Sequence, residues 1–352
     1  MVSATTGAPV ASHYPLIRAA GSHREMGRQH GEQAADKINA HLEKIATEGG
    51  YSRAQLRERA LAFQSLFVKY CPHLFEEIAG LAEGAGIPLA EALAVNIRDP
   101  LKLATAGCTS YVIARAGASA GKILSGKNCD MDPHVPSLGY VLHLKPIDKP
   151  EVLMWTFGGM IGYHGMNSVG VTELDNSLFG EGPPGRWGMP HYPVKRLMLE
   201  CDNVEQIVRL FQMIPVAMNT NYVVADGHGD IVDIEATTAG PEVIRDAHAR
   251  FLAHSNHYLS PRYPGREGFP PDWKDSFARL DRINALINPK LGVITLNDCK
   301  QMLSDHDGYP TSICRHAGKS LTVSSLITEP AEGRMHVSFG NPCEGQFTAY
   351  SM

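Results

Sequence analysis

The sequence of 352 residues has neither a long basic run nor a long apolar run. Its 32 Lys and Arg against 37 Asp and Glu give a formal net charge of −5, which disfavours nucleic acid as a partner. No apolar stretch approaches the roughly 18 residues that span a bilayer, and residues 1–15 lack the basic and apolar segments of a secretory signal. We therefore expect a cytoplasmic protein that binds neither nucleic acid nor membranes.

The cysteines and histidines lack the spacing of common metal sites. The 7 cysteines lie scattered at positions 71, 108, 129, 201, 299, 314 and 343, which is typical of a reduced protein. His254 and His257, supported by Asp305 and His306, are the best metal candidates. However, i, i+3 spacing at a strand end does not put both rings on one face, and no HExxH or CxxC frame accompanies them. We expect no metal and no organic cofactor, with a metal-dependent hydrolase as an alternative that chelation tests.

Residues 14–100 are predicted to be one strand followed by a helical layer. Residues 14–20 have the composition of a strand, and Ser22 with Glu25 three residues later makes a capping box for the next helix. That helix is expected to end at Gly49-Gly50, and further helices over 52–70, around 74–84 and over 88–96 are separated by proline and glycine.

After residue 107 the pattern changes to strands and turns. Short β-branched runs recur from 111 to 174, and 221–225 with 231–235 form the clearest hairpin around the turn at 226–229. Helices are expected over 192–200, 204–213, 276–286 and 296–303, and strands over 323–328, 335–339 and 347–350. Antiparallel strands with helices grouped in blocks predict an α+β fold.

Gly107-Cys108 lies at this change of pattern and is a candidate cleavage junction. Cysteine is a strong nucleophile, but its thiol needs a base or a lowered pKa. If the bond before Cys108 breaks, the freed α-amino group, with a pKa of about 8, can serve as that base. A glycine at 107 leaves room for the attack, which we expect to pass through a strained turn. By itself this dipeptide is also compatible with an ordinary buried cysteine.

Six segments, taken in order, resemble the acyl-coenzyme A:6-aminopenicillanic acid acyltransferase family (peptidase family C45) of N-terminal-nucleophile hydrolases. They are Gly21 to Gly31, Gly107-Cys108-Thr109-Ser110, Gly126-Lys127-Asn128-Cys129-Asp130, Gly165 to Val171, His254-Ser255-Asn256-His257, and Tyr309-Pro310-Thr311-Ser312-Ile313-Cys314-Arg315. Cys129 stands where the family usually has tryptophan. Each motif is weak alone, but their order along nearly the whole chain makes the resemblance specific.

The resemblance implies a single N-terminal-nucleophile hydrolase domain, a four-layer αββα sandwich with two antiparallel sheets between helical layers. It also implies self-cleavage into residues 1–107, mainly helical, and 108–352, which carries the nucleophile. The two fragments are expected to stay associated, and assembly into a homo-oligomer is compatible with the fold.

The resemblance also assigns roles to three residues. Cys108 is expected to cut the chain and then to act as the mature nucleophile, Asp130 to hold its α-ammonium, and Asn256 to donate its side-chain amide to the oxyanion. Tyr111, Trp155, Tyr163 and Arg315 are candidate substrate-binding residues. Trp155 and Tyr163 belong to an aromatic group, with Phe157 and Trp187, whose alternative role is plain core.

We expect hydrolysis of an amide (N-acyl) bond in a small molecule through a thioester acyl-enzyme. The alternatives are an acyltransferase that moves an acyl group from coenzyme A or an amide onto an amine, and a binding protein that keeps the fold without cutting. Coenzyme A thioester is a candidate substrate here, not a cofactor. The penicillin-forming enzyme has an arginine shortly after its "SICR" motif, where this chain reads 316–321 as HAGKSL, so penicillin precursors are not expected substrates.

Overall fold

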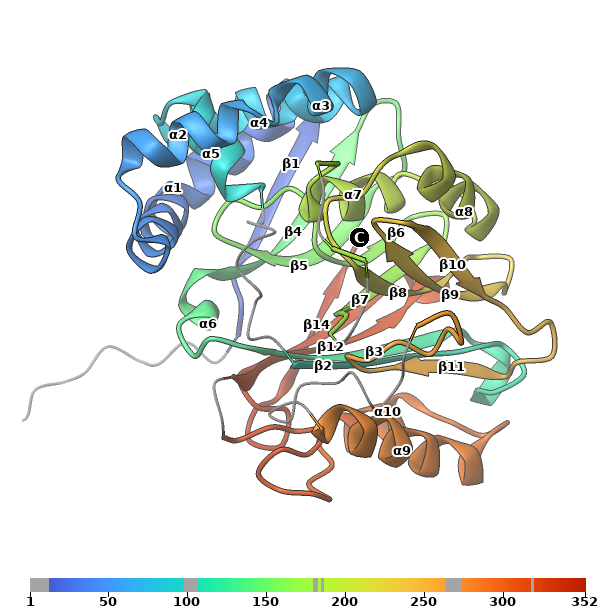
Figure 1. Cartoon of the computed structure of the whole chain (residues 1–352). Helices are drawn as coiled ribbons and strands as arrows, with labels where there is room; N and C mark the ends of the chain where they lie inside the picture. The colour runs from blue at the N-terminus through green and yellow to red at the C-terminus, as the bar shows by residue number, and fades with distance from the viewer. Residues whose placement is uncertain (1–12, 98–106, 180–182, 185–186, 264–273, 318–319) are drawn as a thin grey trace, which may run out of the picture.

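Two β-sheets lie face to face between two layers of helices in the computed structural model (Figure 1). The structure describes residues 13–97, 107–179, 183–184, 187–263, 274–317 and 320–352. The predicted α+β fold and its four-layer αββα sandwich are confirmed.

The N-terminal part is one strand followed by a helical layer, as predicted. Its elements are β1 (Leu16–Gly21), α1 (His23–Gly49), α2 (Arg53–Leu61), α3 (Gln64–Tyr70), α4 (Pro72–Ala85) and α5 (Leu89–Val95). The capping box is present, because the Ser22 side chain accepts from the Glu25 N–H while the Glu25 carboxylate accepts from the Ser22 N–H. The single helix expected over 52–70 is instead two helices, α2 and α3, which break at Ala62 and Phe63.

The first sheet has eight strands in the order β1-β4-β5-β6-β7-β8-β9-β10. After β1 these are β4 (Gly139–Pro146), β5 (Val152–Phe157), β6 (His164–Asn167), β7 (Thr172–Ser177), β8 (Thr220–Ala225), β9 (Ile231–Thr237) and β10 (Gly240–Ile244). The hairpin predicted around 226–229 is the pair β8–β9. The expectation of purely antiparallel sheets fails at one edge, where β1 runs parallel to β4. A parallel pair needs a long crossover, which the intervening helices provide.

The second sheet has six strands in the order β11-β2-β3-β12-β13-β14. They are β2 (Gly107–Ile113), β3 (Leu124–Met131), β11 (Phe251–His254), β12 (Leu321–Glu329), β13 (Arg334–Phe339) and β14 (Phe347–Ser351). The remaining helices are α6 (Val135–Leu138), α7 (His191–Met198), α8 (Val204–Met213), α9 (Asp275–Ile287) and α10 (Leu296–Leu303), with 3₁₀ turns at Ser119–Gly121, Asn288–Lys290 and Pro330–Glu332.

Three apolar layers hold the sandwich together. Helices α1–α5, α7 and α8 pack on the outer face of the first sheet. Between the sheets lie side chains such as Val141 and Trp155 from one and Leu326 and Val337 from the other. Helices α9 and α10 cover the outer face of the second sheet. Because each sheet is covered on both faces, strands such as β2 and β5 are buried along their whole length.

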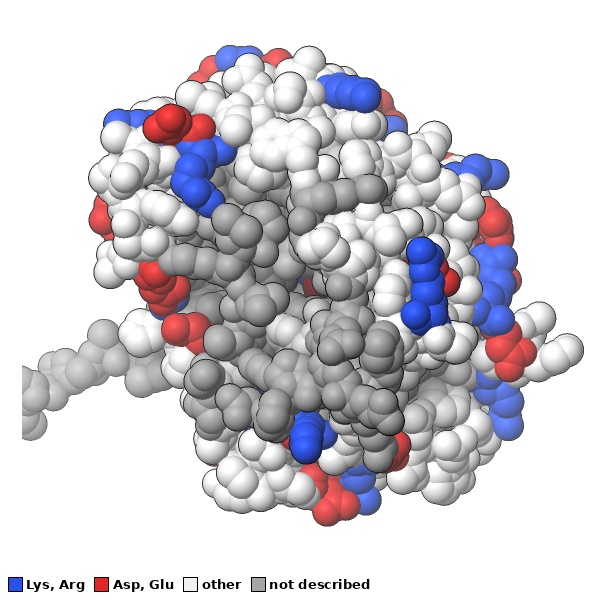
Figure 2. All heavy atoms as spheres, in the orientation of Figure 1, with Lys and Arg blue, Asp and Glu red and all other residues white. Residues whose placement is uncertain are grey.

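Among the described residues, no single helix is long and apolar enough to cross a membrane. The pair α4 and α5 passes that test only together, and the two helices meet at 112°. Their apolar residues belong to the core over the first sheet. On the face shown in Figure 2, Lys and Arg lie interspersed with Asp and Glu around the rim.

Helices α1 and α4 approach each other closely because glycines line their contact. A Cβ added at Gly27 would lie 1.9 Å from the Glu77 carbonyl oxygen, and one at Gly80 would lie 2.0 Å from the Arg24 carbonyl oxygen. Backbone atoms cannot move aside as a flexible side chain can. The two helices can therefore adopt this spacing only with glycine at both positions.

We expect Gly80→Ala to lower the free energy of unfolding by about 1–3 kcal/mol, because the added methyl forces the helices apart. Ala40→Ser, which adds one atom at an exposed position of α1, is the control and should change stability by no more than about 0.5 kcal/mol. Thermal unfolding followed by circular dichroism measures both. Equal stability of the two variants would contradict this account of the packing.

Candidate active site

The pairing of β2 with β3 brings the candidate junction beside the candidate aspartate. Gly107 lies opposite Asp130, and Cys108 lies opposite Cys129. The cysteine predicted to be the nucleophile is therefore at the start of a strand buried along its length, with its neighbour across the ladder also a cysteine. Successive side chains of a strand alternate between its two faces, so the Cys108 and Gly107 positions face opposite sides of the sheet.

The backbone of Cys108 is held at both its nitrogen and its oxygen. Its N–H donates to Asn256 Oδ1 at 2.9 Å, and its carbonyl accepts from the guanidinium of Arg279. Arg279, which is buried, also donates to Thr109 Oγ1 and to Asn256 Oδ1, both at 2.8 Å. One arginine on α9 thus ties Asn256 to the start of β2.

Asn256 is oriented by its own contacts. Its Nδ2 donates to the carbonyl of Ser177 at 2.9 Å, and its backbone N–H donates to Ser276 Oγ at 2.8 Å. With Oδ1 accepting from two donors and Nδ2 donating to a carbonyl, the amide has one favourable orientation. Sequence reasoning expected this amide to donate to an oxyanion, and the structure places its oxygen, not its nitrogen, on the Cys108 N–H.

Asp130 lies beside Gly107 and is buried. Its Oδ1 accepts from Thr322 Oγ1 at 2.6 Å, and a Cβ built at Gly107 would come 2.9 Å from Oδ2 and 2.8 Å from Arg315 Nη1. Burial raises the pKa of Asp130, while Arg279 and Arg315 act in the opposite direction. Gly107 is extended in β2, so the reason for glycine is lack of space, not the strained turn expected from the sequence.

The Cys108 thiol faces a buried lysine. Burial raises the pKa of the Cys108 thiol, and the nearby Lys127 ammonium acts to lower that pKa. Lys127 also lies 3.4 Å from Asp175 Oδ1 and donates to the Asp175 carbonyl. Burial opposes charge on Lys127, but the negative groups around it outweigh that effect and raise its pKa.

Asp175 on β7 is the anion of this buried cluster. Its carboxylate lies 2.7 Å from Lys195 Nζ, 3.0 Å from His164 Nε2 and 3.0 Å from His191 Nε2. Burial opposes its ionisation, but Lys195 and Lys127 outweigh that and hold the pKa of Asp175 well below its usual range. Glu173, on the same strand, has its pKa raised to about 8 by burial.

The four candidate substrate-binding residues do not all come together. Tyr163 lies near the cluster, with Lys195 Nζ 3.9 Å from its ring centre, and Trp155 packs beside it at 5.4 Å between ring centres. Tyr111 lies on the other face of β2, in the core against α10, where its hydroxyl donates to the Cys299 carbonyl. Arg315 is beside Gly107 and pairs with Asp275 at 2.8 Å.

Among the described residues, the histidines weighed as metal ligands, His254 and His257, form no ligand cluster with Asp305 and His306. His254 Nε2 is 3.1 Å from Glu235 Oε1, whereas His257 Nδ1 lies 2.9 Å from Ser276 Oγ. Asp305 pairs with Arg282, and His306 contacts His316.

The stretch 316–321, where the sequence departs from the penicillin-forming enzyme, is described only in part, because residues 318 and 319 lie outside the described part of the chain.

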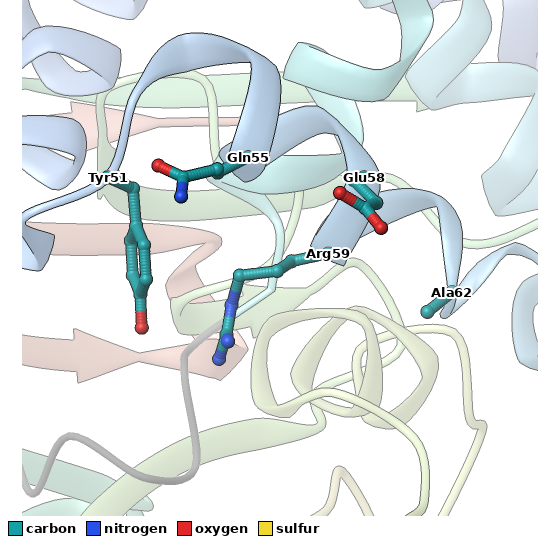
Figure 3. Close-up of a pocket in the computed structure, with 5 residues that line it drawn as sticks. All are labelled: Tyr51, Gln55, Glu58, Arg59 and Ala62. Atoms are coloured by element: carbon teal, nitrogen blue, oxygen red, sulfur yellow. The ribbon is translucent and has the colours of Figure 1, made fainter.

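A surface cavity of about 450 Å³ lies in the helical layer and is separate from these residues. It is lined by Tyr51, Gln55, Glu58, Arg59 and Ala62. Figure 3 shows Tyr51 and Arg59 pointing the same way into it, and the Arg59 guanidinium lies 4.7 Å from the centre of the Tyr51 ring. None of the residues around Cys108 contributes to its wall.

Sequence reasoning missed Arg279, Lys127 and Asp175. The sequence does carry a signal for Lys127 and Asp175, because both are ionisable residues within strands that are buried on both faces. Such a residue must be paired with an opposite charge. Lys127 lies two residues from Cys129 and so shares its face of β3, opposite Ser110 of β2. Arg279 carried no signal, because one arginine on a helix of mixed composition looks like a surface residue.

The four-layer sandwich, with a buried cysteine at the start of an inner strand, defines the class of N-terminal-nucleophile hydrolase folds. A family model for "acyl-coenzyme A:6-aminopenicillanic acid acyl-transferase" matches residues 118–344, more than half of the sequence. The chain therefore belongs to the acyl-coenzyme A:6-aminopenicillanic acid acyltransferase family.

Individual proteins also resemble this chain. The 40 kDa form of the acyl-coenzyme A:6-aminopenicillanic-acid acyltransferase of Emericella nidulans is 26% identical over 337 residues, which are 92% of this chain and 91% of the relative. The N-acylethanolamine-hydrolyzing acid amidase ortholog of Caenorhabditis elegans is 16% identical, with a TM-score of 0.47 over 63% of this chain and 93% of that one. A mutant of the conjugated bile acid hydrolase of Clostridium perfringens is 13% identical, with a TM-score of 0.47 over 69% of this chain and 97% of that one.

We expect Lys127→Met to raise the pKa of the Cys108 thiol further, because the neighbouring cation that favours the thiolate is lost. The pH dependence of Cys108 alkylation by a small haloacetamide, followed by peptide mass spectrometry, should move to higher pH. Lys195→Met is the matched control, because it also removes one cation from Asp175 but leaves Lys127 beside the thiol. Equal shifts in the two variants, with both folded by circular dichroism, would refute a direct effect of Lys127.

Proposed function

We propose that the protein is an amidohydrolase that cuts its own Gly107–Cys108 bond and then uses Cys108 as an N-terminal nucleophile. The observation that carries the proposal is the environment of the Cys108 nitrogen, whose N–H donates to Asn256 Oδ1 at 2.9 Å. After the cut, that nitrogen is an α-amine with a pKa of about 8, able to exchange a proton with the thiol of the same residue. Membership of the acyltransferase family supports this class of chemistry.

In the cutting step, the Cys108 thiolate attacks the carbonyl carbon of Gly107. The carbon–nitrogen bond breaks as a thioester forms, and the departing Cys108 nitrogen takes up a proton. Water then hydrolyses the thioester to the Gly107 carboxylate and the free thiol. Arg279 donates a hydrogen bond to the Cys108 carbonyl and so fixes the backbone on the Cys108 side of the scissile peptide bond. Asp130 lies beside Gly107, on the other side of that bond, where it can hold the new α-ammonium.

In turnover, the Cys108 thiolate attacks the acyl carbon of an amide, and the α-ammonium gives its proton to the leaving amine. Water, deprotonated by the α-amine, then releases the acid from the thioester. Asn256 Nδ2 carries two hydrogens, of which one is bonded to Ser177, and the second is the proposed oxyanion donor. Loss of one such donor typically costs about 10²–10³ in rate. The acyl group is proposed to lie against Tyr163 and Trp155.

The two fragments, 1–107 and 108–352, are proposed to remain together after the cut. The first fragment contributes β1 to a sheet whose other strands belong to the second, pairing with β4 from Leu16 to Gly21. Its helices bury the outer face of that sheet. Separating the fragments would expose this apolar face to water, at roughly 25 cal/mol per Å² of apolar surface.

Acyl transfer is the second candidate. The family description and the named Emericella nidulans relative favour it, because both are acyltransferases by name. The two reactions share the thioester and differ only in whether water or an amine attacks it, so the same residues serve both. A coenzyme A thioester would then be a substrate that donates the acyl group.

Intact mass under denaturing conditions tests the self-cleavage. The parent protein should give two fragments of about 12 and 27 kDa, at ~110 Da per residue, whereas Cys108→Ala should remain one chain of 38.3 kDa. Cys129→Ala, which removes the neighbouring thiol across the ladder, is the control and should still be cut. A single uncut chain for the parent, or cleavage of Cys108→Ala, would reject the proposal.

The partition between hydrolysis and transfer is measured with one acyl donor, an N-acyl amide, with and without an amine acceptor. We expect release of the free acid as the main product in both cases. An acyl-amine product that rises with acceptor concentration while the free acid falls would establish acyl transfer in place of hydrolysis.

A further inference from the structure

At one end of the second sheet, two cysteines and two histidines point their ligand atoms at a common point. His306 follows α10, Cys314 and His316 lie in the loop before β12, and Cys343 lies in the loop between β13 and β14. Their Nε2 and Sγ atoms all lie within 4.8 Å of one another. Three of the four residues lie in the one stretch between α10 and β12, and the fold brings the fourth, Cys343, to them from the loop between β13 and β14.

Four of the six distances within the cluster are close to the edges of a coordination tetrahedron, and the other two, from His306 to the sulfur atoms, are no longer than 4.8 Å. His306 and His316 Nε2 are 3.1 Å apart, the two Sγ atoms 3.5 Å apart, and His316 Nε2 is 3.4 and 3.3 Å from Cys314 and Cys343 Sγ. A tetrahedral zinc with bonds of about 2.0–2.1 Å to nitrogen and 2.3 Å to sulfur has edges of about 3.3–3.8 Å. Each of these four distances lies within about 0.3 Å of the corresponding edge of the zinc tetrahedron.

The surroundings also suit a metal. Asn341 Nδ2 donates to Cys314 Sγ at 3.6 Å, and the Glu344 carboxylate lies 3.8 Å from His316 Nδ1. A carboxylate on the second ring nitrogen directs the first toward a metal, and hydrogen bonds to ligand sulfur are common in such sites. Cys314 is fully buried, whereas Cys343 and His306 are exposed, so an ion can enter from solvent.

We propose that His306, Cys314, His316 and Cys343 bind a zinc ion in a closed structural site. Two thiolates and two imidazoles in a tetrahedron form the donor set that favours Zn²⁺, and four protein ligands leave no position for a substrate. The site ties the two ends of the loop between α10 and β12 to each other and to the loop between β13 and β14.

The zinc site fixes a loop that reaches the candidate active site. Arg315 lies between Cys314 and His316, and its N–H donates to Thr322 Oγ1, which in turn donates to Asp130. The Arg315 guanidinium lies beside Gly107 and pairs with Asp275. The ion therefore holds Arg315 and Asp130 in place without touching a reacting atom, and its binding does not depend on the chemistry at Cys108.

The test is metal content of the full-length protein, purified under reducing conditions, exposed to ZnCl₂ and desalted. We expect about one zinc per chain by elemental mass spectrometry, and less than about a tenth of that in Cys343→Ser and His306→Gln. Cys201→Ser, a cysteine outside the cluster, should keep the zinc of the parent. Substitution with Co²⁺ should give the visible absorption of a tetrahedral thiolate site in the parent and in Cys201→Ser only.

Thermal unfolding keeps the test decisive if a variant folds poorly. A strong chelator should lower the thermal unfolding midpoint of the parent to that of Cys343→Ser. It should leave the unfolding midpoint of Cys343→Ser unchanged. Zinc content in the reduced parent no higher than in Cys343→Ser would overturn the proposal. The proposal would also be overturned if the parent takes up no zinc and its Cys314 and Cys343 peptides are joined with the loss of two hydrogens. Those two cysteines would then form a disulfide.

Discussion

The hydrogen bond from the Cys108 N–H to Asn256 Oδ1 organises the candidate site. It fixes the nitrogen that the proposed cut would turn into an amine, and Arg279 fixes the carbonyl of the same residue. Both partners lie outside the strand they hold, on the segment after β11 and on α9. The position of Cys108 therefore depends on the packing of the second sheet against its helices, which no local motif specifies.

A second constraint is the pairing of buried charge. Lys127 and Lys195 approach Asp175 in a region closed to water, where an uncompensated ion is costly. The arrangement keeps a cation beside the Cys108 thiol although burial favours the neutral form. The fold thus supplies a thiol with an adjacent cation before any cut is made, and the cluster sits where the two sheets meet.

The sequence predicted the fold in most of its parts because the patterns there are local. The capping box of Ser22 and Glu25, the hairpin β8–β9 and helix α8 depend on near neighbours in the chain. The parallel pairing of β1 with β4 and the break between α2 and α3 depend on tertiary packing, which periodicity does not report. In the site, the adjacency of Gly107 and Asp130 follows from strand register. Arg279, and Cys343 of the proposed zinc site, are brought to their partners from distant parts of the chain.

The central claim is that Cys108 is both a new N-terminus and the nucleophile. The most direct measurement is tandem mass spectrometry of the protein after brief reaction with an acyl donor and acid quenching. The account predicts that the larger fragment begins at Cys108 and that the acyl group is attached to the sulfur of this first residue. A fragment that begins elsewhere, or an acyl group found on a different cysteine, would contradict it.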